Sequence, residues 1–377
     1  MKQPTKWIIG VIIVVAVLVF GYSRFKGPSM PLTTKPIKIG AILPLSGKNE
    51  FYGKEIKNAI ELAREEINKT GGINRRGLEV IYEDDQADPK IGTNAMQKLV
   101  VIDKVLVVLG SWVSGVVLAS APIAEKAKVI VMAEAIAPAI TKAGDYIFRI
   151  QPSASYYSKE LMQVVIGKLN LKKISIIYAN NEFGVALKDT INPEVSKLGG
   201  EIVAEESYAQ GDQDFRSQLA KIKAKNPDAL FIGGYQEQAY IIKQAHELGL
   251  KATFLAGPPF ENKKIVEDLG ELAEGVLYPY HFVAETSNPK TIAYLQAYKN
   301  KFNTESGGFA PLMYDAVYLI ARAIEKCGTD TACIKIALYA TEYEGVSGSI
   351  RFDGNGDPLL PIVVKTVKNG NFIRYKE

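Results

Sequence analysis

The sequence predicts an α/β protein built from two doubly wound, mainly parallel sheets, and three observations support this. First, residues 37–85 read as a β-loop-α-β unit: the apolar run IKIGAIL, a turn at PLSG, an amphipathic helix that stops at GlyGlyIle 71–73, and the run LEVIYEDD. Second, the alternation of strand and helix resumes in a second block after residue 153. Third, 377 residues are too many for one ordinary core, so two lobes are expected. The apolar stripe of the first helix consists of Ile56, Ala59, Ile60, Ala63 and Ile67.

Each further strand of the first block is a short apolar run, and each helix has apolar residues three to four positions apart. After the opening unit we expect a helix near 89–101 and a second helix that follows SWVSG and runs through Ala127. The expected strands are 78–85, 105–110, 129–133 and 146–150.

The second block shows the same alternation. Expected helices cover 155–169, 184–198, 213–225 and 236–248, and expected strands cover 174–179, 201–208, 229–234, 253–257 and 275–279. Two long helical patterns follow near 289–303 and 311–326, with a shorter one after Thr331, and the chain ends in the short strands SGSIRF, PIVVKTV and NFIRY. Repeated units of this kind predict two sheets with right-handed crossovers.

The N-terminus predicts export. Seventeen uncharged residues lie between Lys6 and Arg24, and as a helix they span about 25 Å, enough to cross a bilayer core. The alternative is a cleaved signal peptide, but no small-x-small site follows the segment and no Cys follows for a lipid anchor. We therefore expect a cytoplasmic stub (1–6), a transmembrane signal anchor (7–23) and an extended linker (24–36), with the rest of the chain outside the cytoplasm in the periplasm or at the cell surface.

Composition argues against several functions. The net charge is only +4 and no basic block is interleaved with aromatic residues, so nucleic acid is not an expected partner. His246 and His281 are the only histidines, which argues against a His-based metal site or catalytic centre. His281 fits either a hinge role or ordinary packing. Cys327 and Cys333 bracket one turn, which favours a disulfide in an exported chain; a pair of reduced buried thiols is the alternative.

Two motifs resemble known sites but fail in detail. SerGlyLys 46–48 is not a phosphate-binding loop, because six residues instead of four separate Gly40 from Gly47, and Asn49 stands where Ser or Thr is needed. DGNGD at 353–357 is not a calcium loop and reads as a hairpin turn. No GxSxG elbow is present. We expect no enzyme activity, no cofactor and no metal.

The sequences of several segments resemble those of a known family. IGAILPLSG (39–47), FYG (51–53), INKTGGI (67–73) and VIYEDDQADP (80–89) are similar to the first hundred residues of Leu/Ile/Val-type periplasmic binding proteins, and the similarity continues through GGY (233–235), GLK (249–251) and FDGNGD (352–357). These proteins are the substrate-binding components of amino-acid ABC importers and have the type I periplasmic-binding-protein fold.

The resemblance implies two lobes joined by a three-stranded hinge. It places the crossings near Pro152, His281 and Val346. Lobe 1 is then 37–152 plus 282–345, and lobe 2 is 153–281 plus 346–377.

The resemblance also implies a ligand site in the cleft. Tyr52 matches an aromatic residue before a helical glycine, and Ser114 matches the hydroxyl residue after the third strand. Phe183 and Tyr235 match two tyrosines of the second lobe. The full set of implied ligand-binding positions is Tyr52, Trp112, Val113, Ser114, Glu134, Ala135, Ile136, Phe183, Tyr235 and Pro259.

Two departures from the family concern the ligand. An amino acid's carboxylate binds N–H groups and hydroxyls at helix N-termini, and its ammonium binds a carboxylate, carbonyls or an aromatic face. Ile136 replaces the family's Thr, and Pro258-Pro259-Phe260 stands where the family's acid belongs. Glu134 or Glu261 can take over that acid's role; alternatively Glu134 is a rim residue that faces water.

The sequence therefore predicts a membrane-tethered extracytoplasmic solute-binding protein. It would capture an amino acid or a similar small polar ligand between its lobes and deliver it to an ABC permease, a partner that only the resemblance implies. The main alternative is a ligand-sensing receptor ectodomain of the same fold, and an anchored enzyme is the third possibility.

Overall fold

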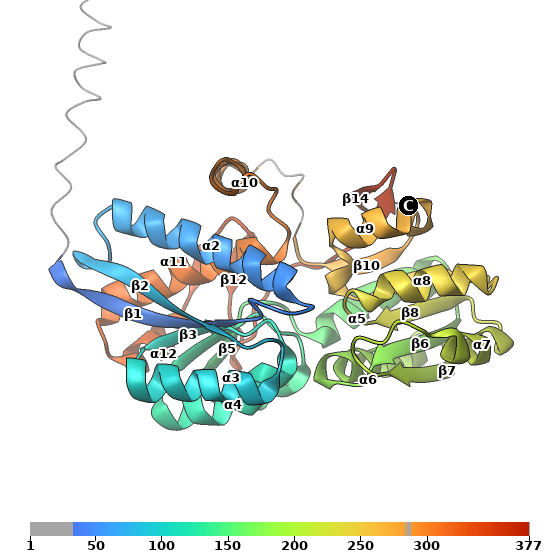
Figure 1. Ribbon diagram of the computed structural model, residues 1–377, viewed down its shortest axis with the longest axis horizontal. Coiled ribbons are helices and arrows are strands. Elements are labelled where there is room, and N and C mark those ends of the chain that lie inside the picture. Colours follow the sequence, from blue (N-terminus) through green and yellow to red (C-terminus); the bar gives the residue numbers. More distant parts are fainter. Residues whose placement is uncertain (1–32, 283, 285–287, 377) are drawn as a thin grey trace, which may run out of the picture.

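The first sheet contains five parallel strands in the order β2-β1-β3-β4-β5. A computed structural model describes residues 33–282, 284 and 288–376 (Figure 1). The strand order reverses at β1, which creates a topological switch point between β1 and β3. The strands are β1 (Thr33–Leu43), β2 (Arg76–Asp84), β3 (Val107–Gly110), β4 (Ile130–Ala133) and β5 (Ile147–Arg149).

Helices cover both faces of this sheet. In Figure 1, α2 and α11 lie on one side and α3 and α4 on the other. All five residues of the stripe predicted for α2 are buried, so that prediction is confirmed. The helices around this sheet are α2 (Glu50–Lys69), α3 (Pro89–Lys98), α4 (Ser114–Ala127), α10 (Pro289–Phe302), α11 (Phe309–Cys327) and α12 (Thr331–Tyr339).

The second sheet has the order β14-β13-β10-β9-β8-β6-β7. Its parallel part, β7-β6-β8-β9-β10, repeats the topology of the first sheet, so it has a second switch point between β6 and β8. β13 pairs antiparallel with β10 and continues into a hairpin with β14. Its strands are β6 (Lys173–Ala179), β7 (Glu201–Tyr208), β8 (Ala229–Gly233), β9 (Thr253–Ala256), β10 (Leu277–Tyr280), β13 (Val363–Lys368) and β14 (Asn371–Arg374).

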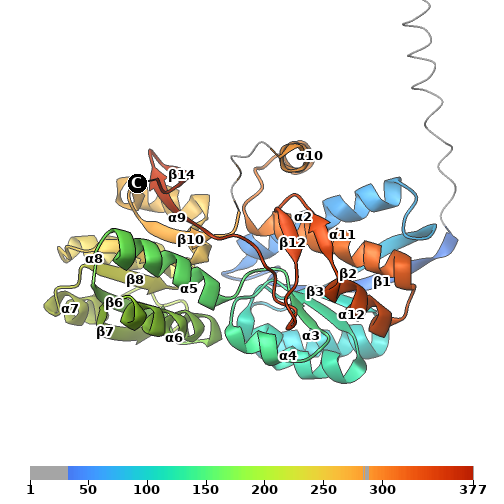
Figure 2. The ribbon, with the colours of Figure 1, turned by 180° about the vertical axis from the view of Figure 1, so that it is seen from behind.

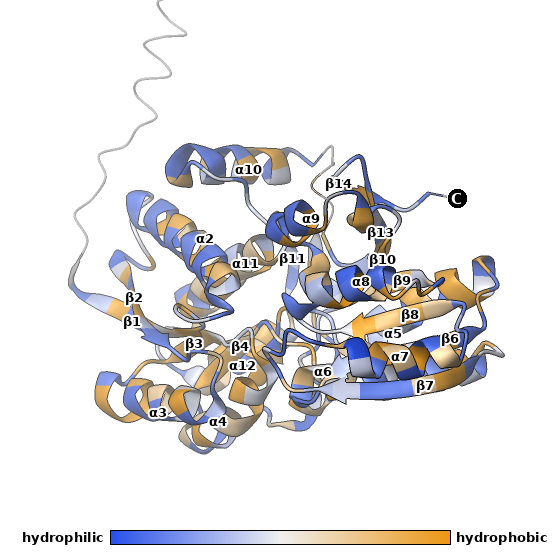
Figure 3. Ribbon diagram, turned by 45° about the vertical axis from the view of Figure 1, so that its right-hand side comes forward, coloured by the Kyte–Doolittle hydropathy of each residue, from blue (hydrophilic) through white to orange (hydrophobic). Residues whose placement is uncertain are grey.

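Hydropathy follows position in this sheet. Figure 3 shows hydrophobic residues along β8, a central strand that is buried throughout, and both hydrophobic and hydrophilic residues on β7, which lies at the edge and is partly exposed. We call each sheet with its packed helices a lobe. The helices of the second lobe are α5 (Ala154–Met162), α6 (Glu182–Lys197), α7 (Arg216–Ala224), α8 (Glu237–Glu247) and α9 (Lys263–Leu269).

Three connections cross between the lobes. The first lies between β5 and α5, and the second lies between β10 and α10. The third lies later than the expected position near Val346. β12 (Ser349–Arg351) pairs with β11 (Glu342–Glu344), and the chain then passes to β13 of the second lobe (Figure 2).

Side-chain hydrogen bonds hold residues 346–357 on the first lobe. The Asp315 carboxylate of α11 accepts the backbone N–H of Val346 at 2.9 Å and that of Ser347 at 2.8 Å. The fully buried Arg149 of β5 binds the Asp357 carboxylate with two nitrogens, at 2.8 and 2.6 Å. The lobe boundary expected at 345/346 therefore moves past Asp357.

The N-terminal predictions concern mostly residues outside the described part of the chain. The stub 1–6, the anchor 7–23 and linker residues 24–32 all lie there. The last four linker residues belong instead to β1, which begins at Thr33. Within residues 33–282, 284 and 288–376, no helix is long and apolar enough to cross a membrane.

The end of α11 is joined covalently to α12. Cys327 and Cys333 form a disulfide across a Cα–Cα distance of 5.6 Å. Farther along, residues 353–357 form a turn that the Asp353 N–H closes on the Asp357 carbonyl.

Candidate functional site

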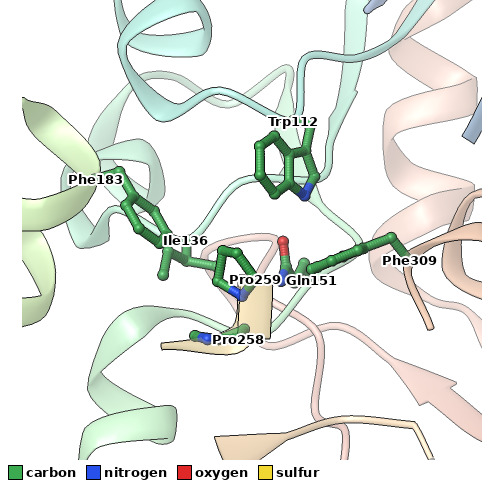
Figure 4. Close-up of a pocket in the computed structure, with 7 residues that line it drawn as sticks. All are labelled: Trp112, Ile136, Gln151, Phe183, Pro258, Pro259 and Phe309. Carbon is green, nitrogen blue, oxygen red and sulfur yellow. The ribbon is translucent and has the colours of Figure 1, made fainter. Parts of the chain in front are cut away.

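A small pocket lies between the two lobes. Six of its seven lining residues follow the carboxyl ends of strands β3, β4, β5, β6 and β9, and the seventh begins α11 (Figure 4). Ligands of open α/β sheets bind at such strand ends, close to the switch points. The lining residues are Trp112, Ile136, Gln151, Phe183, Pro258, Pro259 and Phe309.

Four aromatic rings form a continuous row across the cleft. The Tyr52 ring stacks on Trp112 with centroids 4.2 Å apart, and Trp112 lies 5.3 Å from Tyr235. Tyr235 stacks in turn on Phe183 at 4.6 Å. Because Tyr52 and Trp112 belong to the first lobe and the other two rings to the second, the row joins both lobes. Its faces suit an apolar group or a cation.

Hydrogen bonds also connect the lobes. The Tyr52 hydroxyl donates to the Pro259 carbonyl at 2.9 Å, and Asn262 Nδ2 donates to the same hydroxyl at 3.3 Å. Gln236 Nε2 donates to the Lys48 carbonyl at 3.1 Å. The structure is thus the closed form of the two-lobed molecule.

Ser114 lies at the first turn of α4. The first N–H groups of a helix have no partner within the helix, and they attract anions. The buried Ser114 Oγ accepts the Ala137 N–H at 3.3 Å, which connects α4 to the loop after β4. Val113 and Ala135 are buried beside these loops and do not line the pocket.

The two glutamates weighed as replacements for the family's acid differ in their surroundings. Glu261 accepts the Tyr278 hydroxyl at 2.6 Å and forms an ion pair with Lys365. Glu134 is 0% exposed, so the expectation that it faces water at the rim is wrong. Neither Glu134 oxygen has a hydrogen-bond partner within the described part of the chain. Burial, followed by the nearby Glu55 carboxylate, raises the pKa of Glu134 well above its ordinary value.

A polar cluster lies behind the pocket at the second crossing. The Tyr157 hydroxyl is 2.5 Å from His281 Nδ1, and His281 Nε2 is 3.1 Å from the Gly308 carbonyl. Burial lowers the pKa of His281 to about 3, so the ring is neutral at physiological pH. A neutral imidazole with these neighbours accepts the Tyr157 proton at Nδ1 and donates from Nε2. His281 therefore connects α5 to the start of α11.

Sequence reasoning missed three residues of this site. Gln151 lies on the first crossing, directly before Pro152, and its place after a short strand is a weak signal. Phe309 begins a helix that returns to the first lobe from far along the chain, and only the folded structure brings it to the pocket. Asn262 follows the Pro-Pro step and caps α9.

The positions implied by the resemblance all lie in or next to this pocket, although whether they contact a ligand stays a prediction. Four of the ten line it: Trp112, Ile136, Phe183 and Pro259. Among the described residues, no group of acidic, His and Cys side chains is arranged to hold a metal ion.

Comparison with known proteins decides the family. A family model described as periplasmic binding protein matches residues 36–371. The chain belongs to the periplasmic binding protein family. This binding protein has the type I fold, as its resemblance to the Leu/Ile/Val-type proteins implied.

Individual relatives agree with this assignment. The leucine-, isoleucine-, valine-, threonine- and alanine-binding protein of Pseudomonas aeruginosa is 30% identical over 333 residues, which are 87% of this chain and 89% of the relative. The crystal structure of LivJ, the substrate-binding protein of a branched-chain amino acid transporter from Streptococcus pneumoniae, in complex with isoleucine, has 30% identity and a TM-score of 0.83; the match covers 90% of this chain and 100% of that one.

A third relative binds a different ligand. A solute-binding protein of an ABC transporter from Rhodopseudomonas palustris BisB5, solved in complex with 3,4-dihydroxybenzoic acid, has 27% identity and a TM-score of 0.82, and the match covers 90% of this chain and 96% of that one. The relatives thus include proteins for amino acids and a protein for an aromatic acid.

Proposed function

We propose that this binding protein captures a small amino acid with an apolar side chain in the pocket between its lobes and delivers it to an ABC permease. The observation that carries the proposal is the pocket itself, which loops from the carboxyl ends of both sheets enclose. Tyr52 of one lobe closes over it by binding Pro259 of the other.

The pocket's chemistry supports this ligand class. The aromatic row and Ile136 offer an apolar wall for a side chain. Capture is noncovalent and involves no reaction. The amino acids bound by the Pseudomonas and Streptococcus relatives have the same chemical features.

Two further parts of the proposal concern the chain's organisation. We propose that residues 7–23 anchor the protein in the membrane with the lobes outside the cytoplasm, because seventeen uncharged residues stand there. We also propose lobe 1 as 33–151 plus 288–357 and lobe 2 as 153–280 plus 358–376, with the crossings between them as the hinge. Fractionation of cells that express the full chain tests the anchor, since an anchored protein stays with the membranes after a salt wash.

A thermal-shift screen of the full-length chain in mild detergent tests the function. The panel holds the standard amino acids, amino-acid amides, short peptides, hydroxybenzoates and small carboxylates. A ligand at 100 times its Kd stabilises the native state by about 2.7 kcal/mol, which raises the melting temperature by a few degrees. We expect hits among branched-chain and other apolar amino acids, whereas a panel without any hit would contradict solute capture.

A further inference from the structure

Glu134 is a carboxyl group buried without a partner. Its side chain is completely shielded from solvent, and both of its oxygens lack a hydrogen bond to any residue that the structure describes. Burying a charge without a partner is costly, and buried polar groups of folded proteins are almost always bonded. An unbonded buried carboxyl group next to a pocket therefore indicates that a ligand supplies its partner.

The backbone of Glu134 runs beside the pocket. Its N–H donates to the Ser111 carbonyl at 3.2 Å, and Ser111 directly precedes the pocket-lining Trp112. Two residues farther along, Ile136 lines the pocket as well. Glu134 therefore sits between two loops that form the wall of the pocket.

The groups that interact electrostatically with Glu134 are bonded to other residues at the pocket. Glu55 of α2 accepts the Ala310 N–H at 3.2 Å, next to the pocket-lining Phe309. Tyr157 of α5 accepts a hydrogen bond from the pocket-lining Gln151 at 3.4 Å. Glu134 does not itself line the pocket, but two groups that interact with it are bonded to the pocket-lining Gln151 and to Ala310, the neighbour of Phe309.

The neighbouring charged groups already have partners. Glu55 is bonded to the N-terminus of α11, and Glu261 is paired with Lys365. The buried cation of the first lobe, Arg149, binds Asp357 and the Ala137 carbonyl. Among Glu55, Glu134 and Glu261, only Glu134 has no hydrogen-bond partner within the described residues.

We propose that Glu134 binds a protonated amine of the ligand. It would take the role of the family's acidic residue, whose place in the second lobe is occupied here by Pro258 and Pro259. This inference rests on the proposed function and narrows it. The ligand carries a primary ammonium group directed at the first lobe, and carboxylic acids without an amine, such as the hydroxybenzoates, are excluded.

Binding of an ammonium group should release a proton. Burial and the Glu55 carboxylate raise the pKa of Glu134 well above its ordinary value, which favours the protonated form of this carboxyl group. The pKa of Glu55 is itself raised to about 7. The other titratable group that interacts with Glu134 is Tyr157, whose hydroxyl is bonded to the neutral His281. When the ammonium arrives, the Glu134 O–H bond breaks, its proton passes to the buffer, and the carboxylate pairs with the cation.

Calorimetric titration of the full-length chain with matched ligand pairs tests the proposal. L-leucine is compared with 4-methylpentanoic acid, and L-phenylalanine with 3-phenylpropanoic acid, since each pair differs by the amine alone. The titrations are run on the parent, on Glu134→Gln and on Glu125→Gln, which removes the same charge from the far end of α4. Each titration is repeated in phosphate and in Tris, whose ionisation enthalpies differ.

We expect the parent to bind the amines and to show a buffer-dependent enthalpy that corresponds to release of up to about one proton. Glu134→Gln should weaken amine binding about 10- to 100-fold and abolish the buffer dependence, whereas Glu125→Gln should change neither. Equal binding of both members of a pair would overturn the role of Glu134 but leave solute capture intact. Amine binding by the parent without release of a proton would also overturn the role of Glu134. This test remains valid even if Glu134→Gln does not fold. Absence of binding by every compound would overturn the proposed function as well.

Discussion

Glu55 shows how burial changes the behaviour of a single carboxyl group. Burial raises its pKa to about 7, and the hydrogen bonds from the start of α11 reduce this effect only in part. The folded protein then binds the Glu55 proton more tightly than the unfolded chain does. Between about pH 4.5 and pH 7 the folded state holds more protons, so this group's contribution to stability falls as the pH rises.

Replacing Glu55 should therefore stabilise the protein in a pH-dependent way. Glu55→Gln keeps an acceptor for the Ala310 N–H and cannot ionise. We expect its stability relative to the parent to be greater at pH 8 than at pH 5, by at most about 3 kcal/mol, when measured by urea denaturation at both values.

Glu61, on the same helix, provides the matched control. Burial acts to raise its pKa, but hydrogen bonds from Arg64 and Tyr82 lower it overall. Glu61→Gln should thus lose stability relative to the parent as the pH rises from 3 to 7. If both variants changed with pH in the same direction, this assignment of charges would be wrong.

Tyr52 connects the lobes through one hydroxyl group. Tyr52→Phe keeps the stack on Trp112 but removes the bond to the Pro259 carbonyl. We expect it to weaken ligand binding about 2- to 10-fold, as measured by calorimetric titration. Tyr82→Phe, which removes a hydroxyl on the outer side of the same lobe, should leave the affinity unchanged. Equal affinities of parent and Tyr52→Phe would show that this contact does not hold the closed form.

For single residues, the sequence predicts which side chains lie at the cleft better than it predicts how each side chain is buried and charged. The resemblance implies Tyr52 and Tyr235 as cleft residues because each matches a family aromatic residue next to a glycine, and both rings belong to the aromatic row. The raised pKa of Glu134 could not be predicted, because it comes from burial in the folded structure and from Glu55, which belongs to another element. Phe309 was missed for the same reason, since no local pattern connects the start of a helix to a loop 200 positions earlier.

At the scale of elements, hydrophobic periodicity predicts nearly the whole order of strands and helices. β7 has the expected bounds of 201–208, and most other elements differ by a few residues. The short α9 and the three-residue β11 were missed because segments of this length carry too little periodic signal. The helices predicted over 89–101 and 155–169 are α-helical only as far as Lys98 and Met162. Each then finishes as a π-helical turn, at Leu99–Asp103 and Gln163–Lys168.

The pair of Arg149 and Asp357 connects β5 to the segment after β12. Removing one partner of a buried ion pair leaves the other charge without compensation. We expect Arg149→Met to lower the free energy of unfolding by about 3 to 5 kcal/mol, measured by urea denaturation. The double change Arg149→Met with Asp357→Leu should cost less than the single one, because no charge is then left unpaired.

A second outcome would contradict this account of the third crossing. If Arg149→Met cost less than about 1 kcal/mol, the pair would behave like an exposed one. Residues 352–357 would then not be held on the first lobe by these two side chains.

At the scale of the whole molecule, the two sheets have the same topology and their switch points face one pocket. The family resemblance implied this architecture of two mainly parallel sheets. It placed the third crossing too early, because long-range bonds from Asp315 and Arg149 hold the chain on the first lobe past Val346. Such bonds leave no mark in the local sequence.

Fluorescence of Trp112 tests most directly whether the pocket captures the ligand. Trp7 and Trp112 are the only tryptophans, so Trp7→Phe leaves the pocket-lining ring as the only indole. A ligand that raises the melting temperature should change the Trp112 emission saturably, with a Kd equal to the calorimetric one and one site per chain. A ligand that stabilises the protein but leaves the Trp112 emission unchanged at saturation would show that it binds elsewhere.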